Sequence, residues 1–262
     1  MPPGGYASGL IRPGCPVMSI LRRSGPLLLL LVATLVAATP AGAFRLVPIE
    51  MEFAPSGRDA TRTFSVTNEN SEPVAVEVTV KAREMTETGA DQLTDAYDDW
   101  VVFPEQLILQ PGETQSIRVQ WIGEAAPTKE LPFRLIAEQL AVDIGRPPAQ
   151  GGQVRLLVKY IASLYVVPEG VKPDLRILSA GPAEGGAVLE VLVFNAGTKR
   201  QLLKDASLTL KVGGTSLTLG KDVLEGFAGE NVLPGVTRRF RLPWPPGLPV
   251  GPVDATLSLP TS

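Results

Sequence analysis

Histidine is absent from the 262-residue sequence, and cysteine occurs once, as Cys15. Without histidine the chain cannot form a Ser-His-Asp or Cys-His catalytic site, a histidine-containing zinc site or a histidine general base. A single cysteine cannot form an intrachain disulfide. Only enzyme classes built on carboxylate pairs or on lysine remain. We therefore expect a protein that is not an enzyme and that uses neither a metal nor a cofactor.

Positive charge is not in excess. The chain has 24 Lys and Arg against 27 Asp and Glu, which gives a formal net charge of −3. Proteins that bind nucleic acids need a basic surface to neutralise phosphates. We therefore expect no nucleic-acid partner.

The first 43 residues have the pattern of an export signal. Arg22 and Arg23 precede the small and apolar run 27–37, and Ala41 and Ala43 stand where a signal peptidase reads small residues. The apolar run is short for a membrane span, although a membrane anchor is the alternative. We expect cleavage after Ala43 and a periplasmic mature chain; Met18 is an alternative start. Cys15 would then be lost with the signal.

A motif of the mature sequence occurs twice. The segments 111–121 and 234–244 match in register at five positions, and an upstream apolar strand that ends in Asn68 has its counterpart at Asn195. The matched pairs are Pro111 and Pro234, Gly112 and Gly235, Thr114 and Thr237, Arg118 and Arg241, and Trp121 and Trp244. Internal repetition of this kind predicts one structural unit used twice, hence two tandem domains.

Both halves consist of short β-type runs separated by Gly, Pro, Asn and Asp. The run 74–80 alternates with period two, and no window of helical periodicity competes with such runs. Regular short strands with turns between them predict Ig-like β-sandwiches. We expect an all-β protein with an N-terminal domain over 44–167 and a C-terminal domain over 168–262, joined by the proline-bounded hinge 168–173.

Residues 84–100 form an acidic insertion. Asp91, Asp95, Asp98 and Asp99 are carboxylates that could bind calcium, but they lack the spacing that folds oxygens around one ion. We expect a solvated loop.

The longest predicted strand, 154–167, carries apolar side chains on both faces. Val154, Leu156, Val158 and Tyr160 fall at every second position, with Leu157 and Ile161 among the residues between them. One interpretation is a central strand covered on both sides. The other is an edge strand that stays available for pairing with another chain, which proteins normally prevent.

The chain resembles the PapD-like chaperones of pilus assembly, which consist of two Ig-like domains. The resemblance is carried by Phe64–Asn68, by 102–118, by Lys129-Glu130 before Phe133-Arg-Leu135 and by Val154–Tyr165; it is weaker after residue 168. The insertion 84–100 and the Phe-Arg-Leu sequence look most like the archaic branch of the family. The resemblance implies a periplasmic chaperone that completes secreted Ig-like pilus or coat subunits by lending them a strand, and that delivers them to an outer-membrane usher.

The resemblance also implies site residues. Val154, Leu156, Val158 and Tyr160 correspond to the side chains that fill the groove of a subunit. The best-known members of the family hold the subunit's terminal carboxylate with two basic residues. The corresponding positions here are near Glu52 and at Ser163, and neither is basic. The archaic pattern points instead to Arg134 and, in the second domain, Lys199 or Lys204. Glu130 resembles a residue that joins the domains by an ion pair, whose usual arginine partner falls near Val167.

Two rival hypotheses use other features. The first is a structural or adhesive Ig-like protein, such as a pilin subunit; it should carry a long apolar N-terminal arm, and only 44–49 precede the first domain. The second is a hydrolase with Asp98 and Asp99, or Glu84 and Glu87, as its carboxylate pair. A chaperone with a sticky edge could also cover that edge by self-association when free.

Overall fold

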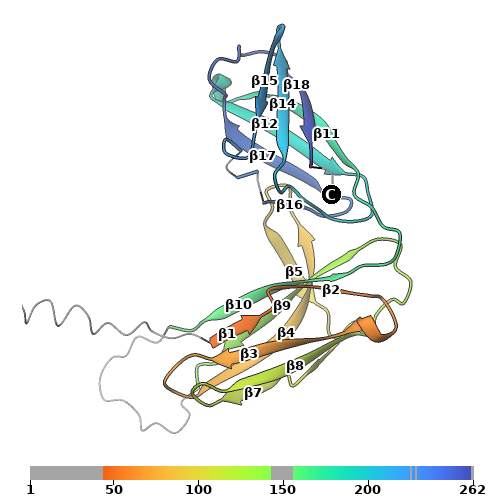
Figure 1. The fold of residues 1–262 in the computed structure, drawn as a ribbon, viewed down its shortest axis with the longest axis vertical. Helices are drawn as coiled ribbons and strands as arrows, with labels where there is room; N and C mark the ends of the chain where they lie inside the picture. Colours follow the sequence, from red (N-terminus) through yellow and green to blue (C-terminus); the bar gives the residue numbers. More distant parts are fainter. Residues whose placement is uncertain (1–43, 143–155, 225, 228, 261–262) are drawn as a thin grey trace, which may run out of the picture. The chain divides into compact units, whose positions relative to one another are not determined.

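The structure, a computed structural model, describes residues 44–142, 156–224, 226–227 and 229–260. The predicted signal peptide and Val154 lie outside these residues. Within them the chain is all-β, as predicted, and Figure 1 shows its strands. Two short 3-10 turns, η1 (Arg58–Ala60) and η2 (Glu184–Gly186), accompany the strands. In the part of the chain that is described, no helix has the length and apolar character needed to cross a membrane.

The first sandwich has a four-stranded sheet and a six-stranded sheet. In the order of pairing, the four-stranded sheet contains β1 (Phe44–Val47), β3 (Thr61–Asn68), β8 (Thr114–Trp121) and β6 (Trp100–Phe103). The six-stranded sheet contains β2 (Glu50–Phe53), β10 (Lys159–Val166), β9 (Leu131–Gln139), β4 (Val74–Met85) and β5 (Asp91–Asp95), and β7 (Gln106–Leu109) pairs with β4. The chain passes from one sheet to the other between β1 and β2.

The second sandwich contains two three-stranded sheets and one short pair of strands. One sheet has the order β11 (Leu175–Ala183), β12 (Val188–Asn195) and β17 (Thr237–Pro243); the other has the order β15 (Thr215–Leu219), β14 (Ser207–Val212) and β18 (Asp254–Ser258). The short pair consists of β13 (Gln201–Leu202) and β16 (Asn231–Val232).

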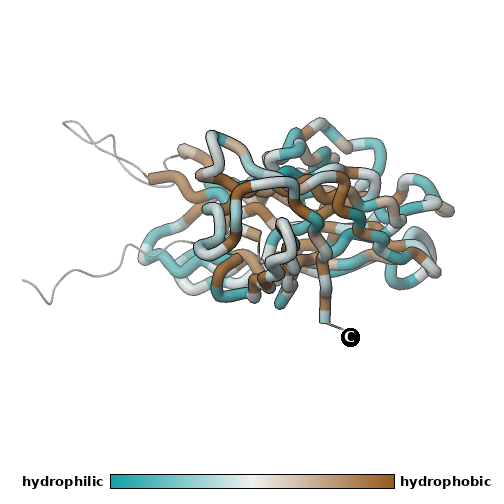
Figure 2. Tube along the Cα trace, turned by 90° about the horizontal axis from the view of Figure 1, so that it is seen from above, coloured by the Kyte–Doolittle hydropathy of each residue, from teal (hydrophilic) through white to brown (hydrophobic). Residues whose placement is uncertain are grey.

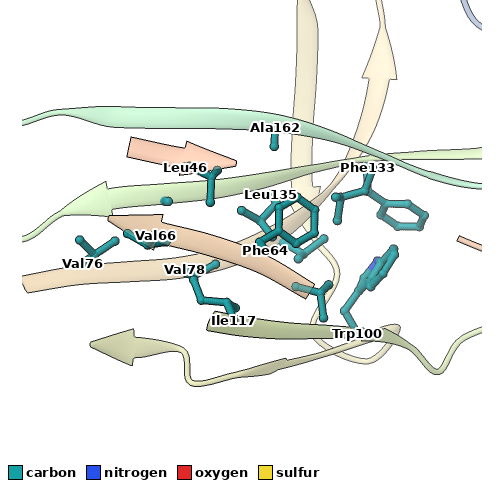
Figure 3. Close-up of a cluster of buried hydrophobic side chains, with 14 of the residues drawn as sticks. Leu46, Phe64, Val66, Val76, Val78, Trp100, Ile117, Phe133, Leu135 and Ala162 are labelled. Carbon is teal, nitrogen blue, oxygen red and sulfur yellow. The ribbon is translucent and has the colours of Figure 1, made fainter. Parts of the chain in front are cut away.

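Each sandwich buries its own hydrophobic core. Alternate side chains of facing sheets meet in the first core, where Phe64, Leu135 and Ile117 are fully buried (Figure 3). A second core, around Val191, Leu210 and other buried residues, shares no residue with the first. Figure 2 colours the trace by hydropathy, and apolar residues are interspersed with polar ones along it. Burial of one face of each strand follows from this period of two.

The internal repeat is confirmed as a structural repeat. β3 pairs antiparallel with β8 in the first sandwich, and β12 pairs antiparallel with β17 in the second. The amide of Asn68 donates to the carbonyls of Glu72 and Leu109 at 2.8 and 3.0 Å, and that of Asn195 donates to Lys199 and Val232 at 2.8 and 3.0 Å. The two asparagines therefore satisfy equivalent buried backbone groups beside the repeated Pro-Gly turns.

The expected loop over residues 84–100 is wrong. β4 continues to Met85 and turns back into β5, so this segment begins as a β-hairpin. Gly89 supplies the turn with φ +87°, and the Thr86 hydroxyl accepts a hydrogen bond from the Ala90 N–H at 3.0 Å. The Thr-Gly pair at this turn favours a hairpin over an irregular loop.

Candidate functional site

One edge of β10 is open over part of its length. Its antiparallel pairing with β9 runs from Lys159 to Val166, but its parallel pairing with β2 begins only at Ser163. Within the described residues, no strand pairs with the other edge of 159–162. An edge of this kind presents backbone groups that can pair with another chain.

The backbone of β10 directs alternate residues to its two edges. The Val158 carbonyl accepts from the Gln139 N–H at 2.9 Å, so Val158 faces β9. The Ser163 N–H donates to the Ile49 carbonyl at 2.8 Å, which is on the opposite edge. In an antiparallel ladder this alternation gives Ile161 and Lys159 the same direction as Ser163. Their N–H and C=O groups therefore point to the open edge.

The side chains of the same segment extend the first core toward its exposed end. Ala162 and Leu164 are fully buried, and Val158 and Tyr160 are partly buried against the core. The Tyr160 ring lies 5.0 Å from the Phe44 ring, edge to face. Leu156, next in this row, is 79% exposed. The row thus passes from buried to exposed, as expected of a core face left unfinished at one end.

Not all of the predicted strand 154–167 is a strand. β10 begins at Lys159, and residues 156–158 have no regular structure, although Val158 still bonds to Gln139. β9 ends at Gln139, so the residues before Val158 have no ladder partner along β9. Of the predicted subunit-binding residues, Leu156, Val158 and Tyr160 lie on one row, and Val154 lies outside the described residues.

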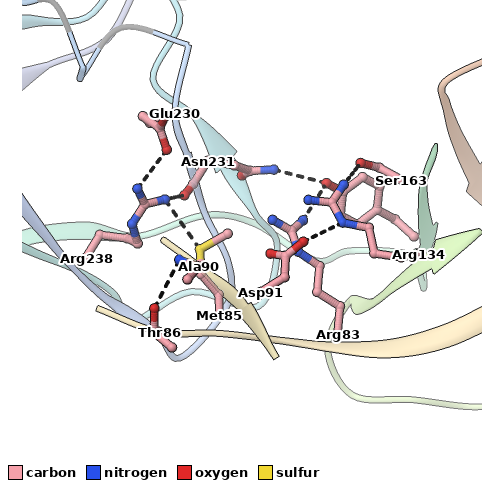
Figure 4. A network of polar contacts seen from close by, with 11 residues as sticks. Arg83, Met85, Thr86, Ala90, Asp91, Arg134, Ser163, Glu230, Asn231 and Arg238 are labelled. Atoms are coloured by element: carbon pink, nitrogen blue, oxygen red, sulfur yellow. Dashed lines mark hydrogen bonds and ion pairs between the residues drawn. The ribbon is translucent and has the colours of Figure 1, made fainter. Parts of the chain in front are cut away.

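Arg134 belongs to a polar cluster on the outer face of the six-stranded sheet (Figure 4). Its Nε lies 2.7 Å from one carboxylate oxygen of Asp91, and its guanidinium also donates to the Ser163 hydroxyl. The Nε of Arg83 lies 2.7 Å from the other oxygen of Asp91, and a second nitrogen of Arg83 donates to the Tyr165 hydroxyl at 3.3 Å. One carboxylate therefore bridges two guanidinium groups.

The pleat explains why these side chains meet. Arg134 is opposite Lys81 on β4 and Ser163 on β10, and Asp91 is opposite Met85. Residues at every second position share a face, so Arg83 joins this set. The side chains of Arg83, Arg134 and Asp91 are only 5%, 18% and 22% exposed.

Lys199 lies in a different cluster, which is centred on Arg200. The Lys199 ammonium is 3.7 Å from the Glu52 carboxylate, and the Arg200 guanidinium is 2.9 Å from the same group. Arg200 also pairs with Glu130 at 2.8 Å and lies over the Tyr165 ring, 3.5 Å from its centre. The partner of Glu130 is thus Arg200, whereas the family pattern places that arginine near Val167.

Lys204 occupies a third location, the exposed turn before β14. Its neighbour Asp205 has φ +52°, which is typical of such a turn. The three predicted anchor residues therefore lie in three different surroundings. Arg134 contacts Asp91 and Ser163, Lys199 contacts Glu52, and Lys204 lies at a turn.

Sequence reasoning missed Arg83, Asp91 and Arg200. Arg83 and Lys81 alternate with the buried side chains of β4, so the period of two could have assigned Arg83 to the face that carries Arg134. Asp91 was hidden because the acidic segment was expected to be a loop. No local pattern indicates that Arg200 would meet Glu130, because these residues are 70 positions apart.

No model of a known protein family matches the sequence, and no curated protein matches it either. Solved structures do match. The class 5 fimbriae chaperone CfaA is 17% identical with a TM-score of 0.53, and the match covers 84% of this chain and all of CfaA. The chain has the fold of the fimbrial chaperones. At this sequence identity the likeness shows only the two-domain β-sandwich fold. The function has to be argued from the geometry of the site.

Two further matches with this chaperone fold come from complexes. A chain from the Salmonella enterica SafA pilin in complex with the SafB chaperone is 20% identical with a TM-score of 0.53; 79% of this chain and 86% of that chain are covered. A chain from the pre-assembly complex of CsuC with the tip subunit CsuE, from the archaic chaperone-usher Csu pili of Acinetobacter baumannii, is 16% identical with a TM-score of 0.51. The match covers 76% of this chain and 89% of that chain.

Proposed function

We propose that the chain is a periplasmic chaperone that binds secreted, incomplete Ig-like pilus or coat subunits by donating the open edge of β10. The observation that carries the proposal is the coincidence of two features on one segment. Ile161 and Lys159 direct their backbone groups to an edge that is unpaired within the described residues, and Leu156, Val158 and Tyr160 form a row that continues the core.

Such a segment supplies what an incomplete sandwich lacks. Backbone hydrogen bonds fix the register of an added strand, and alternate apolar side chains fill the partner's groove. Full burial of an exposed leucine such as Leu156 contributes about 1.5–3 kcal/mol. No covalent step and no nucleotide are required. The matched fimbrial structures include complexes of a chaperone with a pilin or a tip subunit, which supports a subunit as the partner.

The subunit's terminal carboxylate would bind at Arg134. A strand that pairs with 156–162 cannot continue past Ser163, because β2 occupies that edge from Ser163 onward. The end of an added strand would therefore lie beside the Ser163 hydroxyl, to which Arg134 donates a hydrogen bond. A guanidinium at this place favours a terminal carboxylate over a terminal amine. Lys199 and Lys204 remain the proposed second-domain contributors.

Three features of the cellular setting belong to the same proposal. Residues 1–43 would direct export and be removed, the domains would extend over 44–167 and 168–262, and an outer-membrane usher would receive the loaded subunit. An Ig-like adhesin or pilin subunit is the alternative, and it would be found in surface filaments sheared from cells.

Co-expression in the periplasm with the secreted subunit encoded beside its gene tests the donor role. Leu156→Asp together with Val158→Asp should abolish recovery of soluble subunit, while the free chaperone keeps its circular dichroism spectrum and its thermal transition. Ile108→Asp is the matched control, because Ile108 is 52% exposed on β7, away from β10. Unchanged recovery with the double variant, or the finding of the chain itself in sheared filaments, would overturn the proposal.

A further inference from the structure

Two guanidinium groups and one carboxylate meet on the outer face of the six-stranded sheet. Each oxygen of Asp91 lies 2.7 Å from a different arginine, Arg83 or Arg134. The formal charges of the three groups leave one positive charge in excess, on side chains that are 5% and 18% exposed. This is the arrangement of a carboxylate-binding site that already holds a carboxylate.

We infer that Asp91 is the resident occupant of a carboxylate site formed by Arg83 and Arg134, and that a terminal carboxylate of a bound chain must displace it. The inference rests on the proposed function, because it assigns the ligand from the strand that would lie along β10. Arg83 becomes a second member of the anchor, and Asp91 becomes a competitor that keeps the pair satisfied in the free protein.

Asp91 lies at the edge of its sheet, where its carboxylate can be displaced. Asp91 begins β5, which is the outermost strand of its sheet and has β4 as its neighbour. Arg83 and Arg134 lie on the inner strands β4 and β9. The turn of this hairpin is held by β17, because the Arg239 N–H donates to the Glu87 carbonyl at 2.7 Å and the Arg239 guanidinium pairs with the Glu87 carboxylate at 2.7 Å. Displacement of Asp91 therefore requires rotation of its own side chain away from the arginines, and the hairpin stays in place. The Asp91 side chain is 22% exposed and the other four residues of β5 are exposed, so the released carboxylate can turn toward solvent.

A resident carboxylate has a definite consequence for selectivity. Without it, two nearly buried cations would repel each other and would attract any anion in the periplasm. With it, only a carboxylate that is also held along the adjacent edge, by backbone pairing at 156–162, gains enough to replace Asp91. Arg83 and Arg134 would therefore bind the terminal carboxylate of a paired strand in preference to free anions.

Asp91→Asn tests this competition directly. The probe is the peptide acetyl-Thr-Val-Thr-Val-Thr-Val with a free carboxylate, compared with its C-terminal amide, in titrations of the full mature chain. Asp91→Asn should bind the free-carboxylate peptide at least about tenfold more tightly than the unmodified chain does, because the guanidinium pair is then vacant. Binding of the amide should not change. Asp95→Asn, on the same hairpin and beside Lys81, is the matched control and should leave both affinities unchanged.

Two further variants and one measurement complete the test. Arg83→Gln or Arg134→Gln, each combined with Asp91→Asn, should remove the tenfold gain. If Asp91→Asn does not fold, the Nε–H resonances of Arg83 and Arg134 in the unmodified chain give the answer: the saturating free-carboxylate peptide should shift both, and the amide should shift neither. Equal affinities for Asp91→Asn and the unmodified chain, or saturation without a shift, would overturn the inference.

The two proposals can fail separately. Loss of the donor role is detected by subunit recovery with Leu156→Asp, which does not depend on Asp91. If the variant with Leu156→Asp and Val158→Asp loses subunit recovery while Asp91→Asn is unresponsive, only the competition at Arg83 and Arg134 is overturned.

Discussion

The carboxylate of Glu130 lies 2.8 Å from the guanidinium of Arg200, and the Glu130 side chain is fully buried. The loop that precedes β9 contributes the acid, and the turn before β13 contributes the base. The Glu130 N–H also donates to the Thr198 carbonyl at 2.9 Å, so a backbone bond reinforces the ion pair. This contact connects segments of the first and the second sandwich.

Replacement of Arg200 should therefore be costly. Arg200→Met leaves the buried Glu130 carboxylate without its guanidinium, and loss of one partner of a buried ion pair typically costs about 3–5 kcal/mol. Arg241→Met is the matched control, because Arg241 pairs with Glu184 and Glu190 at an exposed site, where such pairs contribute about 0–1 kcal/mol. Urea unfolding measures both. Losses of equal size would show that burial of Glu130 has no such effect.

Glu130 should also make stability depend on pH. Burial raises the pKa of the Glu130 carboxyl, and the charges of Arg200 and Lys199 oppose this shift without cancelling it. The folded chain then holds the proton more tightly than the unfolded chain, so the contribution of Glu130 to stability falls as pH rises from its ordinary pKa of 4.5 through the folded pKa.

Glu130→Gln isolates this effect, because glutamine does not titrate. The free energy of unfolding of the unmodified chain, minus that of Glu130→Gln, should decrease as the pH rises above 4.5, the ordinary pKa of the group. Urea titrations at several pH values provide the difference, in which other titrating groups cancel. A difference that stays constant or increases over this range would contradict the pKa shift.

The repeated asparagines should have similar energetic roles. Both asparagines are fully buried, and Asn68→Ala leaves two carbonyls and one backbone N–H without their side-chain partner. Asn195→Ala leaves two carbonyls and two backbone N–H groups, those of Asp174 and Gly197. We expect each to lower the free energy of unfolding by about 2–4 kcal/mol. Thr209→Ala, which removes an exposed hydroxyl pair, is the control. A loss below about 1 kcal/mol in either asparagine variant would show that water replaces these bonds.

Gly89 should tolerate no side chain. A Cβ at this position would lie 2.3 Å from a guanidinium nitrogen of Arg238, whose side chain is 4% exposed and also bonds to Glu230. Gly112 has a similar φ of +74° but open space around it. Both alanine variants should lose about 1–2 kcal/mol from backbone strain, and Gly89→Ala should lose more because Arg238 must move. Equal thermal transitions for the two variants would contradict this contact.

The fold could be predicted because its signals are local. The period of two in β4, the Pro-Gly turns and the repeated asparagines each specify strands and turns from neighbouring residues. The internal repeat predicted two such sandwiches in tandem, and the resemblance to the pilus chaperones agreed with it. The row Leu156, Val158 and Tyr160 could be predicted for the same reason. The start of β10 could not, because it depends on where β9 ends.

Most contacts in the polar clusters could not be predicted from the sequence. Asp91 reaches Arg134 across 43 positions, and Arg200 reaches Glu130 across 70. Contacts of this kind depend on which strands are neighbours, which alternation alone does not specify. Arg134 was found through a family pattern, whereas Arg83, which shares its carboxylate, follows the predicted strand 74–80 and was assigned no role.

Hydrogen exchange of the backbone amides of 157–162, compared in the free chain and in a complex with a secreted pilus subunit, tests the central claim most directly. The account predicts strong new protection at Lys159 and Ile161, whose N–H groups point to the open edge, and little change in β9. Unchanged exchange at these two amides in a saturated complex would contradict donation of the β10 edge.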